Sequence, residues 1–402
     1  MNKEKIILSA FEQGNGILKL APTWVPRSFL SPGRRLKLAQ EDIYALGVDR
    51  GGINERWLAS TTKADNPKAS DDEGLSYIVI QQNSKNDKIL LKDAIELLGD
   101  LFVGKRMMQN YGGWPVFSKF FDNLCPIPLH LHQREEHAKR VNRAAKPEAY
   151  YFPPQFNMFE GRFPYTFFGL NLGTTRDDIK KCLQKWNMGD NGILNFSQAY
   201  RLKPGTGWLI PPGILHAPGT LVTYEPQRAS DVFTMYQSML EDRPVPWDLV
   251  IKDVPEEHRN DLDYIVDMID WEANLDPEFK KNHYIEPKPV KDPKETREDG
   301  YVEKWIIYGS KHFSAKELTV FPKKTVTIRD AAPYGLIVVQ GRGTIGNFDV
   351  ESPTMIRYGE ITNDELFVTI EAAKDGIKIR NESHTENLVI LKHFGPENPE
   401  AP

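Results

Sequence analysis

Ala199-Tyr-Arg-Leu-Lys-Pro-Gly-Thr-Gly-Trp-Leu-Ile-Pro-Pro-Gly-Ile-Leu-His216 is the stretch of sequence that decides the fold. Its apolar runs are short, and Pro-Gly and Pro-Pro-Gly separate them, as tight turns require. The pattern predicts three consecutive strands joined by two turns, with His216 directly after the second turn. Proline and glycine separate short apolar segments along the whole chain, which contains 29 prolines and 29 glycines. We therefore expect a mainly β protein.

The length of 402 residues predicts two or three domains. Short strand candidates fill residues 1–241 and return in residues 301–402. Between them, residues 242–300 combine an acidic amphipathic stretch (256–273) with a proline-rich segment (284–300) that we interpret as a linker. We expect an N-terminal β domain, a helical insert with its linker, and a C-terminal β sandwich or barrel.

The charge balance and the cysteine content exclude several classes of protein. The chain has 51 Lys and Arg against 56 Asp and Glu, a net charge of −5, which argues against nucleic acid or an anionic membrane as the partner. It contains no apolar run long enough to cross a bilayer. The two cysteines, Cys125 and Cys182, are predicted to be reduced thiols. We expect a cytoplasmic protein that acts on a small molecule, and the sequence leaves its oligomeric state open.

Pro128-Leu-His-Leu-His132 is the strongest chemical signal in the chain. Side chains two apart on a strand face the same way, so His130 and His132 are expected on one side. Glu148, on a following strand, and His216, after the Pro-Pro-Gly turn, can complete the set. Three nitrogens and one oxygen suit a first-row divalent metal such as zinc, iron or manganese.

Several motifs together resemble the type I mannose-6-phosphate isomerases, which belong to the cupin superfamily. The resemblance covers roughly residues 20–240, in the order of the family. It is carried by Gly51-Gly-Ile-Asn-Glu-Arg-Trp-Leu-Ala-Ser, Pro115-Val-Phe-Ser-Lys-Phe-Phe-Asp, Lys146-Pro-Glu-Ala-Tyr-Tyr, Gly173-Thr-Thr-Arg-Asp-Asp, Lys203 to Ala217, and Glu225 with Ser230-Asp231. The resemblance implies two cupin-type β-barrel or jelly-roll domains, the first of them catalytic and metal-binding.

The same resemblance implies a set of metal ligands. His132, Glu148 and His216 take the positions of the family's zinc ligands, and His130 falls where many members have a glutamine. We expect one divalent ion per chain, with zinc first and iron, manganese or nickel as alternatives. Generic cupin spacing nominates Glu136 in place of Glu148, but the Lys-Pro-Glu block favours Glu148.

Two departures from the family concern the substrate. Pro128 stands where the family has a serine, and Met235 where it has an arginine; both family residues lie at the phosphosugar end of the site. Lys146 is retained and is a candidate for substrate binding and for proton transfer. Arg134 and Arg228 are further candidates for binding phosphate, although the spacing from Met235 turns Arg228 to the other face of a regular strand.

The reaction that the resemblance implies is aldose–ketose isomerisation, most simply between mannose 6-phosphate and fructose 6-phosphate through a cis-enediolate. A bound metal would stabilise the developing negative charge, and a buried base would move the proton. Glu225 is the candidate base, with Lys146 and a metal-bound hydroxide left open. The alternatives are a non-catalytic sugar-binding metallo-cupin and an iron-dependent cupin oxygenase.

Overall fold

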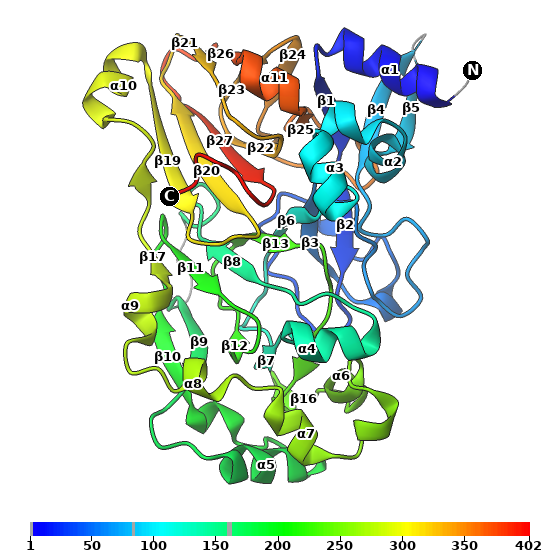
Figure 1. Ribbon diagram of the computed structural model, residues 1–402, viewed down its shortest axis with the longest axis vertical. Helices are drawn as coiled ribbons and strands as arrows, with labels where there is room; N and C mark the ends of the chain where they lie inside the picture. Colours follow the sequence, from blue (N-terminus) through cyan, green and yellow to red (C-terminus); the bar gives the residue numbers. More distant parts are fainter. Residues whose placement is uncertain (1–2, 83–84, 159–162) are drawn as a thin grey trace.

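The computed structural model describes residues 3–82, 85–158 and 163–402. Within these ranges the chain is mainly β, and its strands pair antiparallel, which confirms the expected fold class at that level. Figure 1 shows two groups of sheets along the long axis of the molecule. We call the lower group the first sheet pair and the upper group, which includes the last strand, the second sheet pair.

The first sheet pair joins a five-stranded sheet, ordered β10-β9-β12-β7-β14, and a seven-stranded sheet, ordered β17-β11-β8-β13-β6-β3-β2. The strands are β2 (Thr23–Pro26), β3 (Ile53–Leu58), β6 (Val116–Phe121), β7 (His130–Leu131), β8 (Glu148–Tyr151), β9 (Tyr165–Leu170), β10 (Ser197–Arg201), β11 (Gly207–Ile210), β12 (His216–Ala217), β13 (Thr223–Arg228), β14 (Thr234–Met235) and β17 (Tyr284–Ile285). A short hairpin, β15 (Met239–Leu240) and β16 (Arg243–Pro244), follows β14. The three strands predicted in residues 199–216 are β10, β11 and β12.

The second sheet pair joins a nine-stranded sheet, ordered β18-β19-β20-β27-β22-β25-β1-β4-β5, and a four-stranded sheet, ordered β21-β26-β23-β24. The strands are β1 (Ile17–Ala21), β4 (Tyr77–Gln82), β5 (Lys85–Leu90), β18 (Lys288–Pro289), β19 (Tyr301–Ile307), β20 (Ser314–Val320), β21 (Thr325–Ile328), β22 (Tyr334–Gln340), β23 (Arg342–Ile345), β24 (Phe348–Glu351), β25 (Glu365–Val368), β26 (Ile377–Asn381) and β27 (Leu388–Phe394). Three of these strands come from the first 90 residues, and β1 pairs with β25. The nine-stranded sheet therefore unites segments from both ends of the chain.

The helices are short and lie around the sheets. They are α1 (Lys3–Gln13), α2 (Leu91–Phe102), α3 (Lys105–Tyr111), α4 (Glu135–Ala138), α5 (Arg176–Gln184), α6 (Asp248–Ile251), α7 (Leu262–Asp267), α8 (Trp271–Asn274), α9 (Phe279–His283), α10 (Pro293–Asp299) and α11 (Ile370–Asp375). None of them, in the part of the chain that the structure describes, is long and apolar enough to cross a membrane.

Residues 242–300 contain short helices and short strands. The amphipathic stretch 256–273 holds two short helices, α7 and α8, because the Asp261 and Asp270 side chains accept backbone N–H groups and each start one of them. The segment expected as a linker contains β17, β18 and α10. Since β17 pairs with β11 and β18 pairs with β19, this segment connects the two sheet pairs.

The seven-stranded sheet packs its outer face against the nine-stranded sheet. Phe120 and Tyr224 share one apolar core with Ile306 and Leu391. A buried ion pair adds to the contact: the Arg56 guanidinium binds Asp364 through two bonds of 2.8 Å. The inner face of the seven-stranded sheet is left to meet the five-stranded sheet.

The second sheet pair carries its own buried charges. Lys316 and Lys392 are each 1% exposed, and their Nζ atoms lie 2.6 and 2.7 Å from the two oxygens of Asp330. Glu303 also faces both ammonium groups. These contacts tie β19, β20 and β27 to the segment after β21 by ionic bonds inside an apolar core.

Candidate metal centre

Three histidines project from neighbouring strands into the interior of the first sheet pair. His130 on β7 pairs directly with His216 on β12, and His132 follows β7. All three are buried, as the alternation of Pro128-Leu-His-Leu-His132 predicts for side chains on one face. Their ring atoms can all lie within 4.8 Å of one another, which makes them a possible metal-binding group.

Hydrogen bonds hold each imidazole in one orientation. His130 Nδ1 lies 2.8 Å from the carbonyl oxygen of Pro128. His132 Nδ1 lies 2.6 Å from that of Val232, and His216 Nδ1 lies 2.8 Å from that of Ile214. Because a carbonyl only accepts, each Nδ1 carries the proton and each Nε2 presents a lone pair. This is the usual arrangement of metal-binding histidines.

The turn before His216 explains its Pro-Pro-Gly sequence. Gly213 has a φ of +88°, and a Cβ on it would lie 2.9 Å from Cβ of Asp270 and 3.0 Å from Cδ of Arg134. Its N–H donates to His132 O at 2.8 Å, and its carbonyl accepts from Asn274 Nδ2 at 2.8 Å. Glycine at this position therefore lets the β11–β12 connection approach the β7 end and sets His216 beside His132.

Glu148, the first residue of β8, brings a carboxylate from the opposite sheet. Its oxygens lie 2.9 Å from His132 Nε2 and 3.1 Å from His216 Nε2. The alternative ligand Glu136 has a side chain that is 57% exposed and pairs with Arg134. Of the two glutamates that the sequence nominates, the structure brings Glu148 to the histidines.

The donor set fits a divalent metal ion. The buried His216 Nε2 atom has no hydrogen-bond partner among the described residues. Burial lowers the pKa of His130 well below its usual value, and burial together with Lys146 lowers the pKa of His132 to about 4, so both rings are neutral ligands. Although burial opposes it, the Lys146 ammonium group holds the pKa of Glu148 well below its usual range. Neutral imidazoles and an ionised carboxylate are the forms that bind zinc or iron.

Lys146 and Glu225 lie directly beside these donors. Lys146 Nζ is 2.9 Å from Glu148 Oε2, 3.1 Å from His132 Nε2 and 3.6 Å from Glu225 Oε1. Glu225, on β13, is 2% exposed. Burial and the neighbouring Glu148 carboxylate raise the pKa of Glu225 to about 8. A carboxyl group in this setting can both accept and return a proton near neutral pH.

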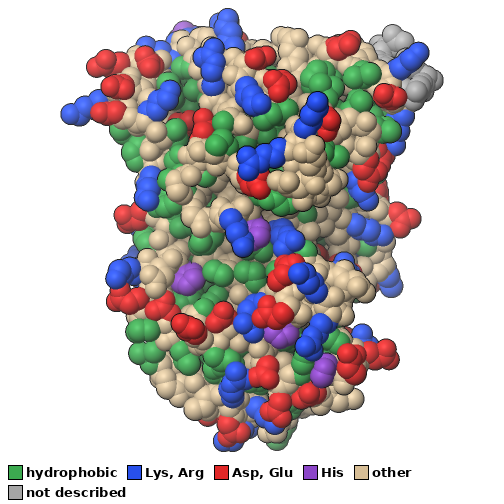
Figure 2. All heavy atoms as spheres, in the orientation of Figure 1, with side chains coloured by type: hydrophobic (Ala, Val, Ile, Leu, Met, Phe, Trp, Pro, Cys, Tyr) green, Lys and Arg blue, Asp and Glu red, His purple; other side chains and the backbone are tan. Residues whose placement is uncertain are grey.

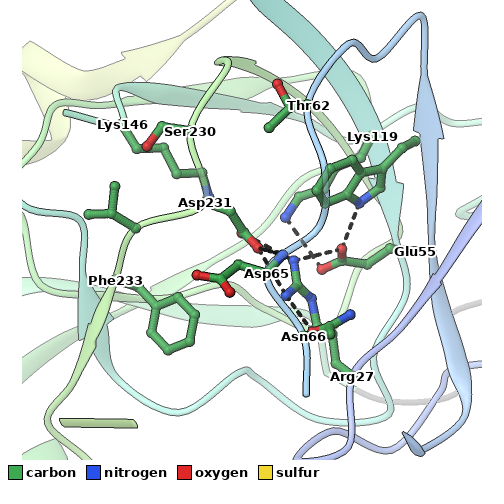
Figure 3. Close-up of polar contacts among 12 residues, drawn as sticks. Arg27, Glu55, Thr62, Asp65, Asn66, Lys119, Lys146, Ser230, Asp231 and Phe233 are labelled. Atoms are coloured by element: carbon green, nitrogen blue, oxygen red, sulfur yellow. Dashed lines mark hydrogen bonds and ion pairs between the residues drawn. The ribbon is translucent and has the colours of Figure 1, made fainter. Parts of the chain in front are cut away.

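A chain of buried ion pairs continues from Glu225, and the sequence analysis did not foresee it. Lys119 lies between Glu225 (3.3 Å) and Glu55 (3.4 Å), and Arg27 lies between Glu55 (3.3 Å) and Asp231 (3.2 Å). Figure 3 shows Arg27 pointing between the two carboxylates. The Trp57 indole N–H also donates to Glu55, at 2.8 Å. Three of these residues, Lys119, Glu55 and Asp231, lie in the motifs that carry the family resemblance. Those motifs were the one sequence signal that could have pointed to the ion pairs.

The charges of this interior are nearly balanced. Three cations, Arg27, Lys119 and Lys146, face four carboxylates, Glu55, Glu148, Glu225 and Asp231. Because the pKa of Glu225 is raised to about 8, Glu225 is mostly protonated at neutral pH, and three ionised carboxylates then face the three cations. A divalent cation would give this interior a net positive charge, which attracts an anionic ligand.

The remaining predicted residues lie in two places. Met235 is buried and pairs in register with His130, and Pro128 supplies the carbonyl that accepts from the His130 ring. Both positions at which the sequence departs from the family pattern therefore lie beside the candidate ligand His130. Arg134 and Arg228, in contrast, line a cleft of about 780 Å³, and its lining includes no residue of the donor set.

Comparison with solved structures places this geometry in context. The putative mannosephosphate isomerase from Archaeoglobus fulgidus superposes with a TM-score of 0.61 over 94% of this chain and 97% of that one, at 13% identity. The chain has the fold of the mannose-phosphate isomerases. A variant of phosphomannose isomerase from Salmonella typhimurium gives a TM-score of 0.60 at 12% identity, over 95% and 100% of the two chains.

A zinc-bound mannose 6-phosphate isomerase also shares this fold, with a TM-score of 0.59 at 12% identity and coverage of 95% and 100%. No protein-family model and no curated protein sequence matches the chain. The structural match confirms the resemblance to mannose-phosphate isomerases that the motifs carry. It extends over nearly the whole chain, including the C-terminal segment, where the motifs are unspecific.

Proposed function

We propose that this protein is a metal-dependent aldose–ketose isomerase, and that its substrate pair is mannose 6-phosphate and fructose 6-phosphate. One observation carries the proposal: a buried carboxyl group and a buried ammonium group, Glu225 and Lys146, adjoin a set of three histidines and one ionised glutamate. Proton transfer between neighbouring carbons needs both a base and stabilisation of the developing charge.

In this proposal His130, His132, Glu148 and His216 hold one divalent ion, zinc in the first place, with iron, manganese and nickel as alternatives. The bound ion supplies electrostatic stabilisation of negative charge on the substrate oxygens. Glu225 moves the proton between C1 and C2 of the open-chain sugar. Its raised pKa favours this role because a base is most effective when its pKa lies near the working pH.

Lys146 serves as a positioning and charge-stabilising group for the same reaction. Its ammonium group reaches both Glu148 and Glu225, so it can hold the two carboxyl groups at a fixed separation. It can also donate a hydrogen bond to a substrate oxygen that enters between them. Arg134 and Arg228 line the separate cleft and are assigned a different role below.

We also propose a division of the chain into domains. Residues 1–241 would form the catalytic cupin-type unit, residues 242–300 the insert and connection, and residues 301–402 a second cupin-like unit. Strands β1, β4 and β5 would be contributed by the first unit to the sheet of the second. We further propose that the enzyme works in the cytoplasm.

A second function is favoured by the two departures from the family pattern. Pro128 and Met235 bring apolar groups to the neighbourhood of His130, where the family has a serine and an arginine. A metallo-cupin that binds a sugar without turnover would need fewer polar groups there. The set of three histidines and one glutamate would also suit an iron-dependent oxygenase.

Anaerobic assay of metal-loaded protein separates these functions. The isomerase proposal predicts conversion of mannose 6-phosphate to fructose 6-phosphate without oxygen, and loss of the activity on chelation. Glu225→Gln should retain one metal ion per chain and lower kcat by at least about a hundredfold. The exposed Glu272→Gln variant is the matched control and should keep full activity.

Other outcomes would favour the alternatives. Oxygen consumption by iron-loaded protein would favour the oxygenase. Metal-dependent sugar binding without turnover, on a panel of free and phosphorylated sugars, would favour the binding protein. An unchanged rate in Glu225→Gln would remove Glu225 as the base while leaving the isomerase reaction itself standing.

A further inference from the structure

A cleft lies between the first and second sheet pairs, and none of the candidate metal ligands lines it. Its volume is about 780 Å³, which is within the usual range for small-molecule sites. One wall comes from the segment around α4 and from β11 and β13; the other comes from the β19–β20 connection, residues 309–312, and from residues 396–397. Figure 2 shows basic side chains around a histidine at mid-height on this face of the molecule.

Cationic groups are in excess at this cleft. Arg134, Arg228 and Lys311 line it together with the carboxylates Glu135 and Glu397. Each carboxylate already has a cation from outside the lining: Lys139 lies 3.7 Å from Glu135, and Arg106 lies 2.6 Å from Glu397. Glu135 also binds Arg228 at 2.9 Å, and Glu136, outside the lining, binds Arg134 at 3.2 Å. Among the described residues, Lys311 is therefore the cation of the lining that has no acid.

Lys311 is exposed, and its ammonium group is available to an anion in the cleft. It forms no ion pair and no hydrogen bond with any residue that the structure describes, although Arg228 does bind Glu135 at 2.9 Å. Next to it, burial together with Arg228 and Lys311 lowers the pKa of His312 to about 4. Three groups that repel one another when charged thus converge on one space, an arrangement that an anion stabilises.

The rest of the lining suits a ring rather than a bare ion. Leu209, Pro147, Pro211 and Pro212 form an apolar wall, and Tyr111 lies on the same cleft. A sugar or base ring attached to a phosphate would place its apolar face on the prolines and its charge near Lys311. Phosphate accepts several hydrogen bonds at once, which matches the guanidinium and ammonium donors.

We propose that this cleft is a binding site for a small organic phosphate, separate from the metal centre, in which Lys311, Arg228 and His312 hold the phosphate group. The site adjoins the catalytic region through the chain itself, because Ala145 and Pro147 in its lining flank Lys146. An occupant would contact the residues on either side of Lys146. This proposal does not rest on the isomerase reaction.

Calorimetric titration of the metal-loaded protein tests the site with three probes: inorganic phosphate, a hexose 6-phosphate and adenosine monophosphate. We expect at least one probe to bind, and Lys311→Ala to weaken that binding by about tenfold, as loss of a charged hydrogen-bond donor does. The exposed Lys294→Ala variant on α10 is the control for net charge and should bind like the parent. The probe that binds most tightly shows whether a sugar or a nucleotide is the source of the phosphate.

Arg228→Met provides a second, independent variant and should weaken the same probe. Binding at the metal centre alone would leave both variants unchanged, and that result would overturn the proposal. So would failure of all three probes to bind, or equal weakening by Lys294→Ala. Unchanged melting temperatures of the variants serve as the check that the fold is intact.

Discussion

The Tyr224 hydroxyl lies 3.2 Å from Nδ1 of His393, and this contact joins β13 to the last strand of the chain. Both residues are buried, at 0% and 1% exposure. Tyr224 points out of the first sheet pair, while the next residue, Glu225, points into it, as alternation along a strand requires. The residue next to the candidate base is thus anchored by a histidine of the second sheet pair.

His393 makes stability dependent on pH. Burial lowers the pKa of His393 to about 3, whereas an unfolded histidine titrates near 6.5. Between these values the unfolded chain binds one more proton than the native chain, so the free energy of unfolding falls as pH falls. The contribution is about 1.4 kcal/mol per pH unit.

Replacing His393 by glutamine should remove this contribution while keeping a partner for Tyr224. Urea unfolding between pH 7 and pH 5 should show a shallower loss of stability in His393→Gln than in the parent. The exposed His384→Gln variant should follow the parent. Equal slopes in parent and His393→Gln would contradict the burial of a neutral ring at this position.

The Arg56 ion pair predicts a large loss of stability when it is broken on one side. Arg56→Met leaves Asp364 and Glu365 buried without their cation, at a cost of about 3–5 kcal/mol. The exposed Arg380→Met variant should change stability by less than about 0.5 kcal/mol. Chemical unfolding measures both, and a loss below 1 kcal/mol in Arg56→Met would show that the carboxylates reach solvent or protonate at little cost.

The metal ligands are tested by occupancy rather than by activity. His216→Ala should lose the divalent ion, because it removes one of the three imidazoles that share the site. His258→Ala, at a histidine near the start of α7, should keep it. Elemental analysis after gel filtration gives the stoichiometry, and full occupancy in His216→Ala would exclude His216 as a ligand.

Replacement of Gly213 should lower both the stability of the fold and the affinity for the metal ion. Gly213→Ala combines a φ of +88° with a contact of 2.9 Å to Asp270 Cβ. Gly173 has the same φ with nothing within 4 Å of an added Cβ, so Gly173→Ala measures the backbone strain alone, about 1–2 kcal/mol. We expect Gly213→Ala to cost more in thermal unfolding and also to lower metal affinity, and equal effects of the two variants would refute the role of the turn.

Much of the metal centre could be predicted because its residues follow local rules. Alternation on a strand was sufficient to put His130 and His132 on one face, and the Pro-Pro-Gly turn located His216. Glu148 depended on the family motif, since nothing local distinguishes it from Glu136. The Arg27–Asp231 pair spans 204 residues of sequence and depends on which strands become neighbours, which no local pattern encodes.

The helices were predicted less well for a related reason. The capping box of Thr175 and Asp178 marked the start of α5. In residues 256–273, the apolar spacing predicted an amphipathic helical stretch, and the capping by Asp261 and Asp270 decides where the short helices α7 and α8 begin. The pairing of β1 with β25 could not be foreseen, because each strand alone is compatible with many partners.

Lys316 and Lys392 balance the buried carboxylates Asp330 and Glu303 without any bound ion. If the proposed function holds, removal of the divalent ion would stop the reaction and would leave the charge balance of the C-terminal strands unchanged.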